Sequence, residues 1–200
     1  MRLIGITGPS GSGKSAASEY LKKYDFKVID ADLVYHEIIS QPSDCVKELV
    51  NNFGEDIISC TGGIDRPSLA GKVFGEENKE KLLLLNKITH KYVISEIEKK
   101  IKSYDEEGAI NCVIDAPLLI EAGVDKMCDT VISVIADRDV RAKRISARDG
   151  IDIDAAYKRI DSQKPDSFYK DHSDRVFQNN NGLDELGKQI DLYLKNRSII

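Results

Sequence analysis

The 200-residue sequence contains no tryptophan, two methionines, three histidines and five prolines, and it has no excess of basic residues. Its net charge of −5 argues against a general nucleic-acid-binding protein, which usually carries a basic surface or stripe. No apolar run in the sequence approaches the length of about 18 residues that suggests a membrane span. We therefore expect neither a nucleic acid nor a membrane as a partner.

The sequence also lacks the cysteine spacings of a zinc or redox site, because its four cysteines lie far apart and no C-x-x-C pair occurs. They are Cys45, Cys60, Cys112 and Cys128. We interpret them as reduced core thiols. The start of the chain shows no signal-peptide pattern. The sequence therefore predicts a cytoplasmic protein, and we expect a monomer or a weak homo-oligomer.

Short apolar segments alternate with longer helical patterns, which is typical of an α/β protein whose parallel sheet is covered by helices. The five predicted strands are 2–7, 27–29, 110–115, 130–135 and 175–177. Some eighty residues separate the second predicted strand from the third, roughly several times what one crossover helix needs. We interpret most of this segment as an inserted helical subdomain.

These patterns predict one domain with three parts. The parts are a nucleotide-binding core (about 1–30, 106–137 and 172–200), a helical insertion that binds the acceptor (about 31–105) and a helical lid (about 138–171). A proline follows the third predicted strand, and we expect a helix to begin at Pro117 because proline suits the first turn.

The most specific motif is Gly8 to Ser15, which reads GPSGSGKS, fits G-x-x-x-x-G-K-[ST] and directly follows the first predicted strand. Backbone N–H groups of such a loop form an anion site, and the helix that follows adds the positive end of its dipole. Lys14 can reach the β- and γ-phosphates, and Ser15 can bind Mg²⁺. The predicted nucleotide contacts in this segment are Gly11, Ser12, Gly13, Lys14, Ser15 and Ala16. The loop predicts a nucleoside triphosphate such as ATP as ligand.

Two acidic positions follow predicted strands. Asp30 and Asp32 come directly after the second strand, at the sheet edge where ligands of α/β proteins bind. Asp32 is our candidate general base, with helix capping as the alternative role for either residue. Asp115 ends the apolar third strand, in the manner of a Walker-B acid that organises a metal ion, although many buried strands end in aspartate.

Arginines recur at spacings of three, three and four in the lid segment. They are Arg138, Arg141, Arg144 and Arg148, and the spacing places them on one face of a helix. Such a face can close over phosphate oxygens, with Arg144 as a catalytic residue and Arg148 as a nucleotide contact. The alternative is a solvated helix face paired with neighbouring aspartates.

Taken together, these motifs and several shorter ones make the chain resemble the dephospho-coenzyme A kinase family almost from end to end. The shared blocks are Gly5 to Gly8, Gly11 to Ser15, Val28 to Asp32, Asp65-Arg66 with Leu69-Ala70 and Val73-Phe74, Ile88 to His90, Pro117 to Leu119 with Glu121, Arg144, Arg148 to Gly150, Arg159 and Ser162-Gln163. Lys91 stands where the family usually has proline, and Pro9-Ser10 replaces its commoner Gly-Ile.

The resemblance implies a three-layer P-loop fold like that of nucleoside monophosphate kinases. It also implies ATP- and Mg²⁺-dependent phosphorylation of the ribose 3′-hydroxyl of dephospho-CoA. Asp32 would then be the general base, and Arg66, His90 and Leu118 would bind the acceptor. Among residues 179–181, which fit the family's asparagine before a glycine, we choose Asn180 as the nucleotide contact.

Two other functions remain open at this point. Another small-molecule P-loop kinase, for a nucleoside or nucleotide, would share the core but lack the Asp65-Arg66 and Ile88 to His90 blocks. A GTPase-like switch would need an N-K-x-D motif, and the segment 86–89 reads N-K-I-T instead.

Overall fold

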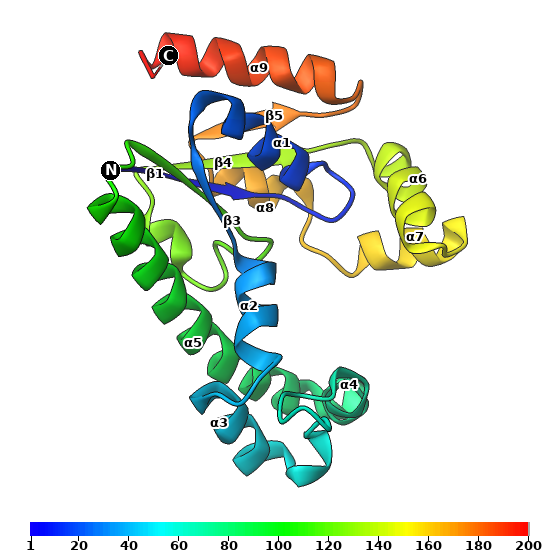
Figure 1. The fold of residues 1–200 in the computed structure, drawn as a ribbon. Coiled ribbons are helices and arrows are strands. Elements are labelled where there is room, and N and C mark those ends of the chain that lie inside the picture. Colours follow the sequence, from blue (N-terminus) through cyan, green and yellow to red (C-terminus); the bar gives the residue numbers. More distant parts are fainter. Residues whose placement is uncertain (200) are drawn as a thin grey trace. The chain divides into compact units, whose positions relative to one another are not determined.

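The computed structural model describes residues 1–199 and divides the chain into two compact units. The first unit comprises Met1–Asp30 and Ser103–Ile200, and the second comprises Ala31–Lys102. The second unit is thus a continuous insertion between two segments of the first. Figure 1 traces the chain through both units by colour.

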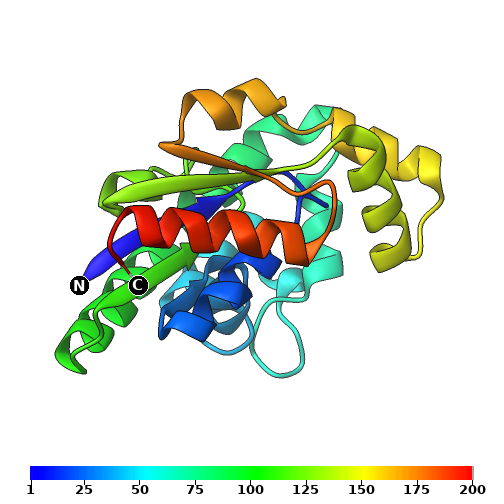
Figure 2. The same ribbon diagram turned by 90° about the horizontal axis from the view of Figure 1, so that it is seen from above.

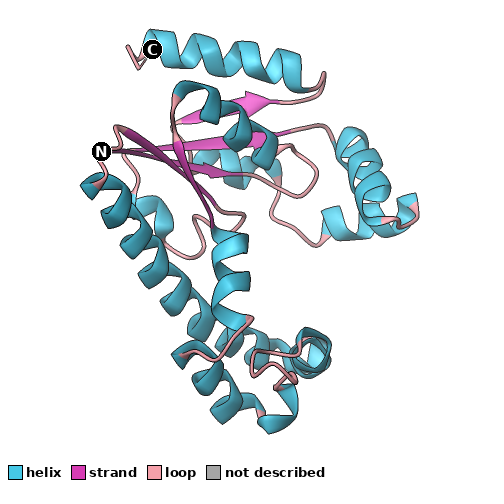
Figure 3. Ribbon diagram, viewed as in Figure 1, coloured by secondary structure: helices cyan, strands magenta, loops and turns pink. Residues whose placement is uncertain are grey.

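The first unit is built on one sheet of five parallel strands (Figures 1 and 3). The strands are β1 (Arg2–Thr7), β2 (Lys27–Asp30), β3 (Asn111–Asp115), β4 (Thr130–Ile135) and β5 (Arg175–Gln178). Their order across the sheet is β2-β3-β1-β4-β5, and every pairing is parallel. The α/β class and the five strands predicted from the sequence are confirmed, with three of the strands differing by one residue at an end.

Helices cover both faces of this sheet. The helices of the first unit, some of which cover the sheet, are α1 (Lys14–Leu21), α6 (Arg138–Asp149), α7 (Ile153–Asp161), α8 (Asp166–Asp171) and α9 (Leu183–Asn196). Helices α8 and α9 lie on opposite faces of the sheet (Figures 1 and 2). The buried side chains Ile4 and Ile6 of β1 pack in one core with residues of α1 and α9. Gly5 between them faces the other layer, where a Cβ would stand 2.7 Å from Leu119, as the alternation of a strand requires.

Helices α6 and α7 pack on each other through a small core of their own, made of Ala142, Ile145, Ala156 and Ile160. The turn between them uses Gly150, whose φ of 65° is left-handed and ends α6. Asp152 then caps the N-terminus of α7, because its side chain accepts a hydrogen bond from the Ala155 N–H at 2.7 Å.

The helix predicted from Pro117 is wrong. The chain makes hydrogen-bonded turns there, followed by a 3-10 helix over Val124–Met127. Gly123 adopts a left-handed φ of 74°, and the N–H groups of Val124 and Asp125 both donate to the Leu119 carbonyl. This arrangement closes the run of turns over residues 117–123 in place of an α-helix.

The second unit is helical apart from its turns and one isolated antiparallel bridge between Ile58 and Ile64. Its helices are α2 (Ala31–Ile39), α3 (Asp44–Phe53), α4 (Arg66–Val73) and α5 (Lys79–Glu106), the last of which continues into the first unit. Their apolar faces share a separate core that includes Leu49, Leu69 and Ile88. Ser43 caps α3 and Asp65 caps α4, each accepting a hydrogen bond from the N–H three residues later.

Candidate functional site

The segment between β1 and α1 has a backbone that only glycine can supply at three points. Gly8, Gly11 and Gly13 have φ values of 152°, 78° and 96°. A Cβ on Gly8 would stand 2.2 Å from the Val134 carbonyl oxygen, and one on Gly13 would stand 2.1 Å from the Asn179 amide nitrogen. The loop therefore packs directly against the ends of β4 and β5, and no side chain fits in the way.

Ser12 lies at the bottom of this loop and is fully buried. Its N–H donates to the Pro9 carbonyl at 3.2 Å, while its hydroxyl has no hydrogen-bond partner among the described residues. A buried hydroxyl group normally has a hydrogen-bond partner, and a bound ligand can supply it. A glycine-lined concave backbone with such a donor, followed by a helix N-terminus, fits an anion such as a phosphate.

Lys14 and Asp115 form an ion pair at the mouth of the loop. Lys14 is the first residue of α1, and Asp115 is the last residue of β3, which neighbours β1 in the sheet. Their side chains are 12% and 2% exposed, so water screens this pair little. Ser15 and Ala16 continue the first turn of α1, and Ser15 is exposed.

Three of the four arginines predicted to share a helix face contact the phosphate loop. Arg144 donates from Nη1 to the carbonyl oxygens of Gly11 and Ser12, each at 3.3 Å. Arg148 donates to the Ser10 hydroxyl at 3.4 Å, and Arg141 donates to the Ser10 carbonyl at 2.9 Å. The exception is Arg138, which pairs with Asp161 of α7 and lies over the Tyr157 ring.

Burial and ion pairing act in opposite directions on these arginines. Burial lowers the pKa of Arg144 from its usual value, because desolvation disfavours the charged form. Arg148 instead has a raised pKa, chiefly from its hydrogen bonds to Asp149, and with Arg159 it lowers the pKa of Asp149 to about 2. Arg148 therefore serves both the loop contact and the solvated pair with its neighbouring aspartate.

The asparagine that contacts the loop is Asn179, which the sequence reasoning missed. Its side chain is buried, donates to the Ser12 carbonyl at 2.8 Å and accepts from Arg144 at 3.4 Å. The side chain of Asn180 accepts instead from the Asp137 N–H at 2.8 Å. Asn179 directly follows β5, and this position at the carboxyl end of a strand was the signal that could have found it.

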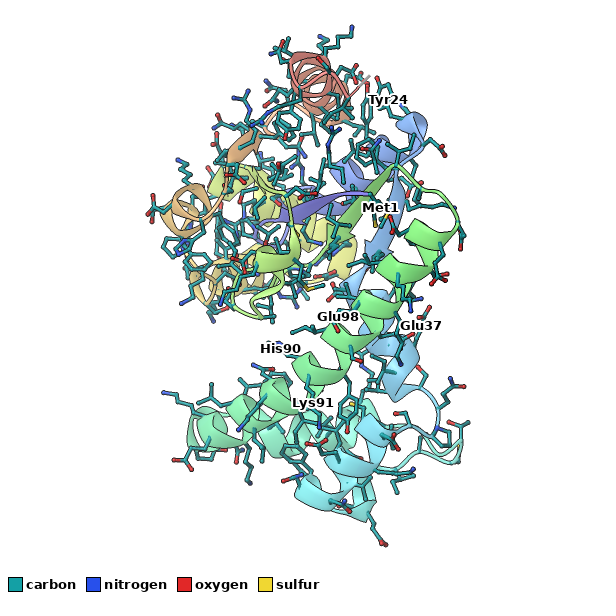
Figure 4. The ribbon with its side chains drawn as sticks, turned by 90° about the vertical axis from the view of Figure 1, so that its left-hand side faces the viewer. Met1, Tyr24, Glu37, His90, Lys91 and Glu98 are labelled. Atoms are coloured by element: carbon teal, nitrogen blue, oxygen red, sulfur yellow. The ribbon has the colours of Figure 1, made fainter. Side chains whose placement is uncertain are left out.

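The candidate acceptor residues of the second unit lie on three helices. Asp32 belongs to the first turn of α2, and Arg66 is the first residue of α4. Arg66 Nη1 approaches Nε2 of His36, also on α2, to 3.4 Å. His90 lies on α5 beside Lys91 (Figure 4), and Lys91 pairs with Glu48 at 2.9 Å. The unbroken α5 shows that lysine at this position continues the helix.

The described residues contain neither a membrane-spanning helix nor a cluster of potential metal ligands. Among them no helix is both long and apolar enough to cross a membrane. Among the side chains that the structure describes, no three or more histidine, cysteine, aspartate and glutamate residues gather closely enough to hold a metal ion.

Comparison with known proteins decides the family. The family model for dephospho-CoA kinase matches residues 2–185. A dephospho-CoA kinase of Fusobacterium nucleatum is 40% identical over 191 residues, which cover 96% of each chain. That of Corynebacterium efficiens is 37% identical over 96% of this chain and 94% of its own. The solved dephospho-CoA kinase of Campylobacter jejuni matches with a TM-score of 0.70 and 26% identity, covering 98% of this chain and all of its own. The chain belongs to the dephospho-CoA kinase family.

The blocks that it shares with this family divide into buried and outward-facing residues. In the block Ile88 to His90, Ile88 and Thr89 are buried, and the Thr89 hydroxyl donates to the Leu85 carbonyl within α5. His90 alone is partly exposed. In the same way Leu119 is fully buried, whereas Leu118 is 44% exposed. The dephospho-CoA kinase blocks therefore combine core positions with a few solvent-exposed side chains.

Proposed function

We propose that this chain transfers the γ-phosphoryl group of ATP to the ribose 3′-hydroxyl of dephospho-CoA and releases ADP and CoA. One observation carries the proposal beyond family membership. Asp30, Asp115 and Ile6 are partners in register at the carboxyl ends of β2, β3 and β1. The phosphate loop leaves the sheet at this end, where ligands of α/β proteins bind, and Asp32 follows the last residue of β2 by two positions in the chain. This order supports Asp32 as the base.

The phosphate loop supplies the donor side. Backbone N–H groups of residues 11–16 bind the β- and γ-phosphates, and Lys14 exchanges its Asp115 carboxylate for phosphate oxygens when ATP binds. Ser15 and Asp115 offer the hydroxyl and carboxylate oxygens that suit Mg²⁺, which would neutralise phosphate charge when bound. Arg144, already at the rim of the loop, stabilises charge on the transferred group.

Asp32 supplies the base. Its carboxylate accepts the proton of the acceptor hydroxyl, whose oxygen forms a bond to the γ-phosphorus while the bond to the bridging oxygen of ADP breaks. The lid helices α6 and α7, with Arg148, exclude water from the γ-phosphoryl group. This exclusion matters because water would otherwise act as the acceptor. Asn180 remains our nucleotide contact beside the buried Asn179.

The second unit supplies the acceptor site in this proposal. Arg66 and His90 bind anionic groups of dephospho-CoA, and Leu118 of the first unit offers it an apolar contact. Arginine suits this role because its planar guanidinium binds phosphate through two hydrogen bonds at once. A cytoplasmic location is also part of the proposal, and the four free thiols support it.

The test is a product assay on the purified chain with ATP, Mg²⁺ and dephospho-CoA, in which ADP and CoA are quantified by chromatography. We expect the two products in equal amounts and no ADP without the acceptor. A nucleoside and a nucleoside monophosphate serve as comparison acceptors. Preference for either of them would favour a different small-molecule kinase, and the absence of acceptor-dependent ADP would contradict kinase activity of this kind.

A further inference from the structure

Ser10 of the phosphate loop is held by a closed set of three hydrogen bonds. Its N–H donates to Oε1 of Gln163 at 3.1 Å, and its carbonyl accepts from Nε of Arg141 at 2.9 Å. Nη2 of Arg141 donates to the same Gln163 oxygen at 2.7 Å. Both backbone groups of one loop residue are thus satisfied by two side chains that contact each other.

The arginine of this set is buried against the loop. Arg141 is 4% exposed, and a Cβ on Gly11 would stand 2.8 Å from its carbonyl oxygen, so the backbone of α6 itself packs on the loop. A carboxylate oxygen of Asp166 lies 3.5 Å from Nη1 and offsets part of the cost of burying the charge. Its guanidinium is committed to the loop backbone, to Gln163 and to this aspartate.

Gln163 connects the loop to the stretch between α7 and α8. It lies two residues after the last residue of α7 and two residues before Pro165, which precedes α8. Its single side-chain oxygen accepts from both Arg141 and Ser10. Removing that oxygen leaves two donors without their acceptor at the same place.

We propose that Arg141 and Gln163 are positioning residues that hold the phosphate loop in its ligand-binding shape before the nucleotide binds. This inference rests on the proposed function only in taking the ligand of the loop to be ATP. A loop with three glycines at positive φ has many alternative conformations, and ordering it on binding costs affinity. A loop that is already ordered binds its ligand more tightly because that cost is removed.

The chain offers a matched control in the pair Arg138 and Asp161. These residues join α6 to α7 through three hydrogen bonds of 2.9 to 3.2 Å. Both residues are exposed, and they bind each other rather than the loop. Asp161→Asn therefore weakens a contact of the lid segment without removing a loop contact. Gln163→Met keeps the length of the side chain and removes the acceptor oxygen.

The experiment compares wild type, Gln163→Met and Asp161→Asn by ATP and ADP binding calorimetry and by kinetics. Hydrogen exchange of the peptide that covers residues 8–15 is followed in the nucleotide-free protein. We expect Gln163→Met to weaken nucleotide binding and raise the KM for ATP about tenfold, as loss of hydrogen bonds with a charged partner predicts. The KM for dephospho-CoA and kcat at saturating ATP should stay within about twofold. Exchange in the loop should become faster in this variant and not in Asp161→Asn.

Equal behaviour of Gln163→Met and wild type in nucleotide binding and loop exchange would overturn the inference. So would a fall in kcat with unchanged nucleotide affinity, because that pattern belongs to a group acting in the transition state. Arg141→Lys provides a second variant, which keeps the charge but loses the forked geometry and should also weaken binding. Binding and exchange need no acceptor. They therefore test the inference even if dephospho-CoA proves not to be the substrate.

Discussion

The two units differ in what their candidate functional groups are made of. In the first unit the phosphate loop is shaped by glycine backbone, and its contacts come from Arg141, Gln163 and Asn179, more than a hundred residues away in the chain. In the second unit the candidates Arg66 and His90 project from helices that have their own core. The proposed donor site is therefore built into the fold, whereas the proposed acceptor site depends on side chains that can be exchanged with less effect on folding.

The largest effect is expected on the donor side. Lys14→Met should lower turnover by about 10²–10³-fold, because it removes charge stabilisation from the transferred group. It should also destabilise the fold by about 3 kcal/mol, because the carboxylate of Asp115 then stays buried without its ammonium partner. Steady-state kinetics and urea unfolding measure the two effects.

The variant Lys14→Met with Asp115→Asn separates these effects. It should recover most of the lost stability, since no unpaired buried charge remains, and none of the lost activity. Recovery of activity together with stability would mean that Lys14 matters only for folding, and the contrast between the two units would lose its basis.

On the acceptor side a smaller and more selective effect is expected. Arg66→Met should raise the KM for dephospho-CoA about tenfold through the loss of charged hydrogen bonds, with the KM for ATP and the melting temperature nearly unchanged. Lys47→Met is the matched control, because Lys47 is an exposed cation of the same unit that pairs with Asp44. A change in the KM for ATP, with the KM for dephospho-CoA unchanged, would instead place Arg66 in the donor site.

The smallest effect concerns the cysteines of the two units. Burial raises the pKa of Cys112 and Cys128 in the first unit to about 12 and that of Cys45 in the second to about 11. These groups stay protonated from pH 7 to pH 9, and the thiolate is the reactive form. A disulfide reagent should therefore modify one thiol of the native protein rapidly, the exposed Cys60. The rapid phase should disappear in Cys60→Ser, and rapid labelling of further thiols would show that the cores open readily.

The phosphate loop could be predicted from the sequence because all residues of its motif are neighbours in the chain. Gly8 to Ser15 lie in one segment after an apolar strand, and neighbouring residues supply both the glycine torsions and the helix N-terminus. The side chains that contact the loop could not be predicted in the same way, because these contacts depend on how elements distant in the chain pack. Choosing Asn179 rather than Asn180 as the loop contact requires knowing where β5 ends.

The helical spacing of the arginines predicted that they share one face of α6, but it did not predict all of their contacts. It grouped four arginines on one face of α6, yet Arg138 pairs with Asp161 of α7, a neighbour that spacing within one helix does not reveal. The helix expected at Pro117 failed because Gly123 closes the turn. The acceptor blocks were recognised by family resemblance, and the structure adds that residues such as Ile88 and Thr89 in them are core positions.

The proposed division of roles is that the phosphate loop holds the donor while Asp32, which follows β2, activates the acceptor. Single-turnover transfer from ATP to dephospho-CoA by Asp32→Asn tests it most directly, with Asp30→Asn as the matched control and ATP affinity measured in both. In Asp32→Asn we expect ATP binding within about twofold of wild type and transfer slowed by about 10²–10⁴-fold, the range for loss of a general base. Transfer by Asp32→Asn at a rate near that of wild type would contradict it.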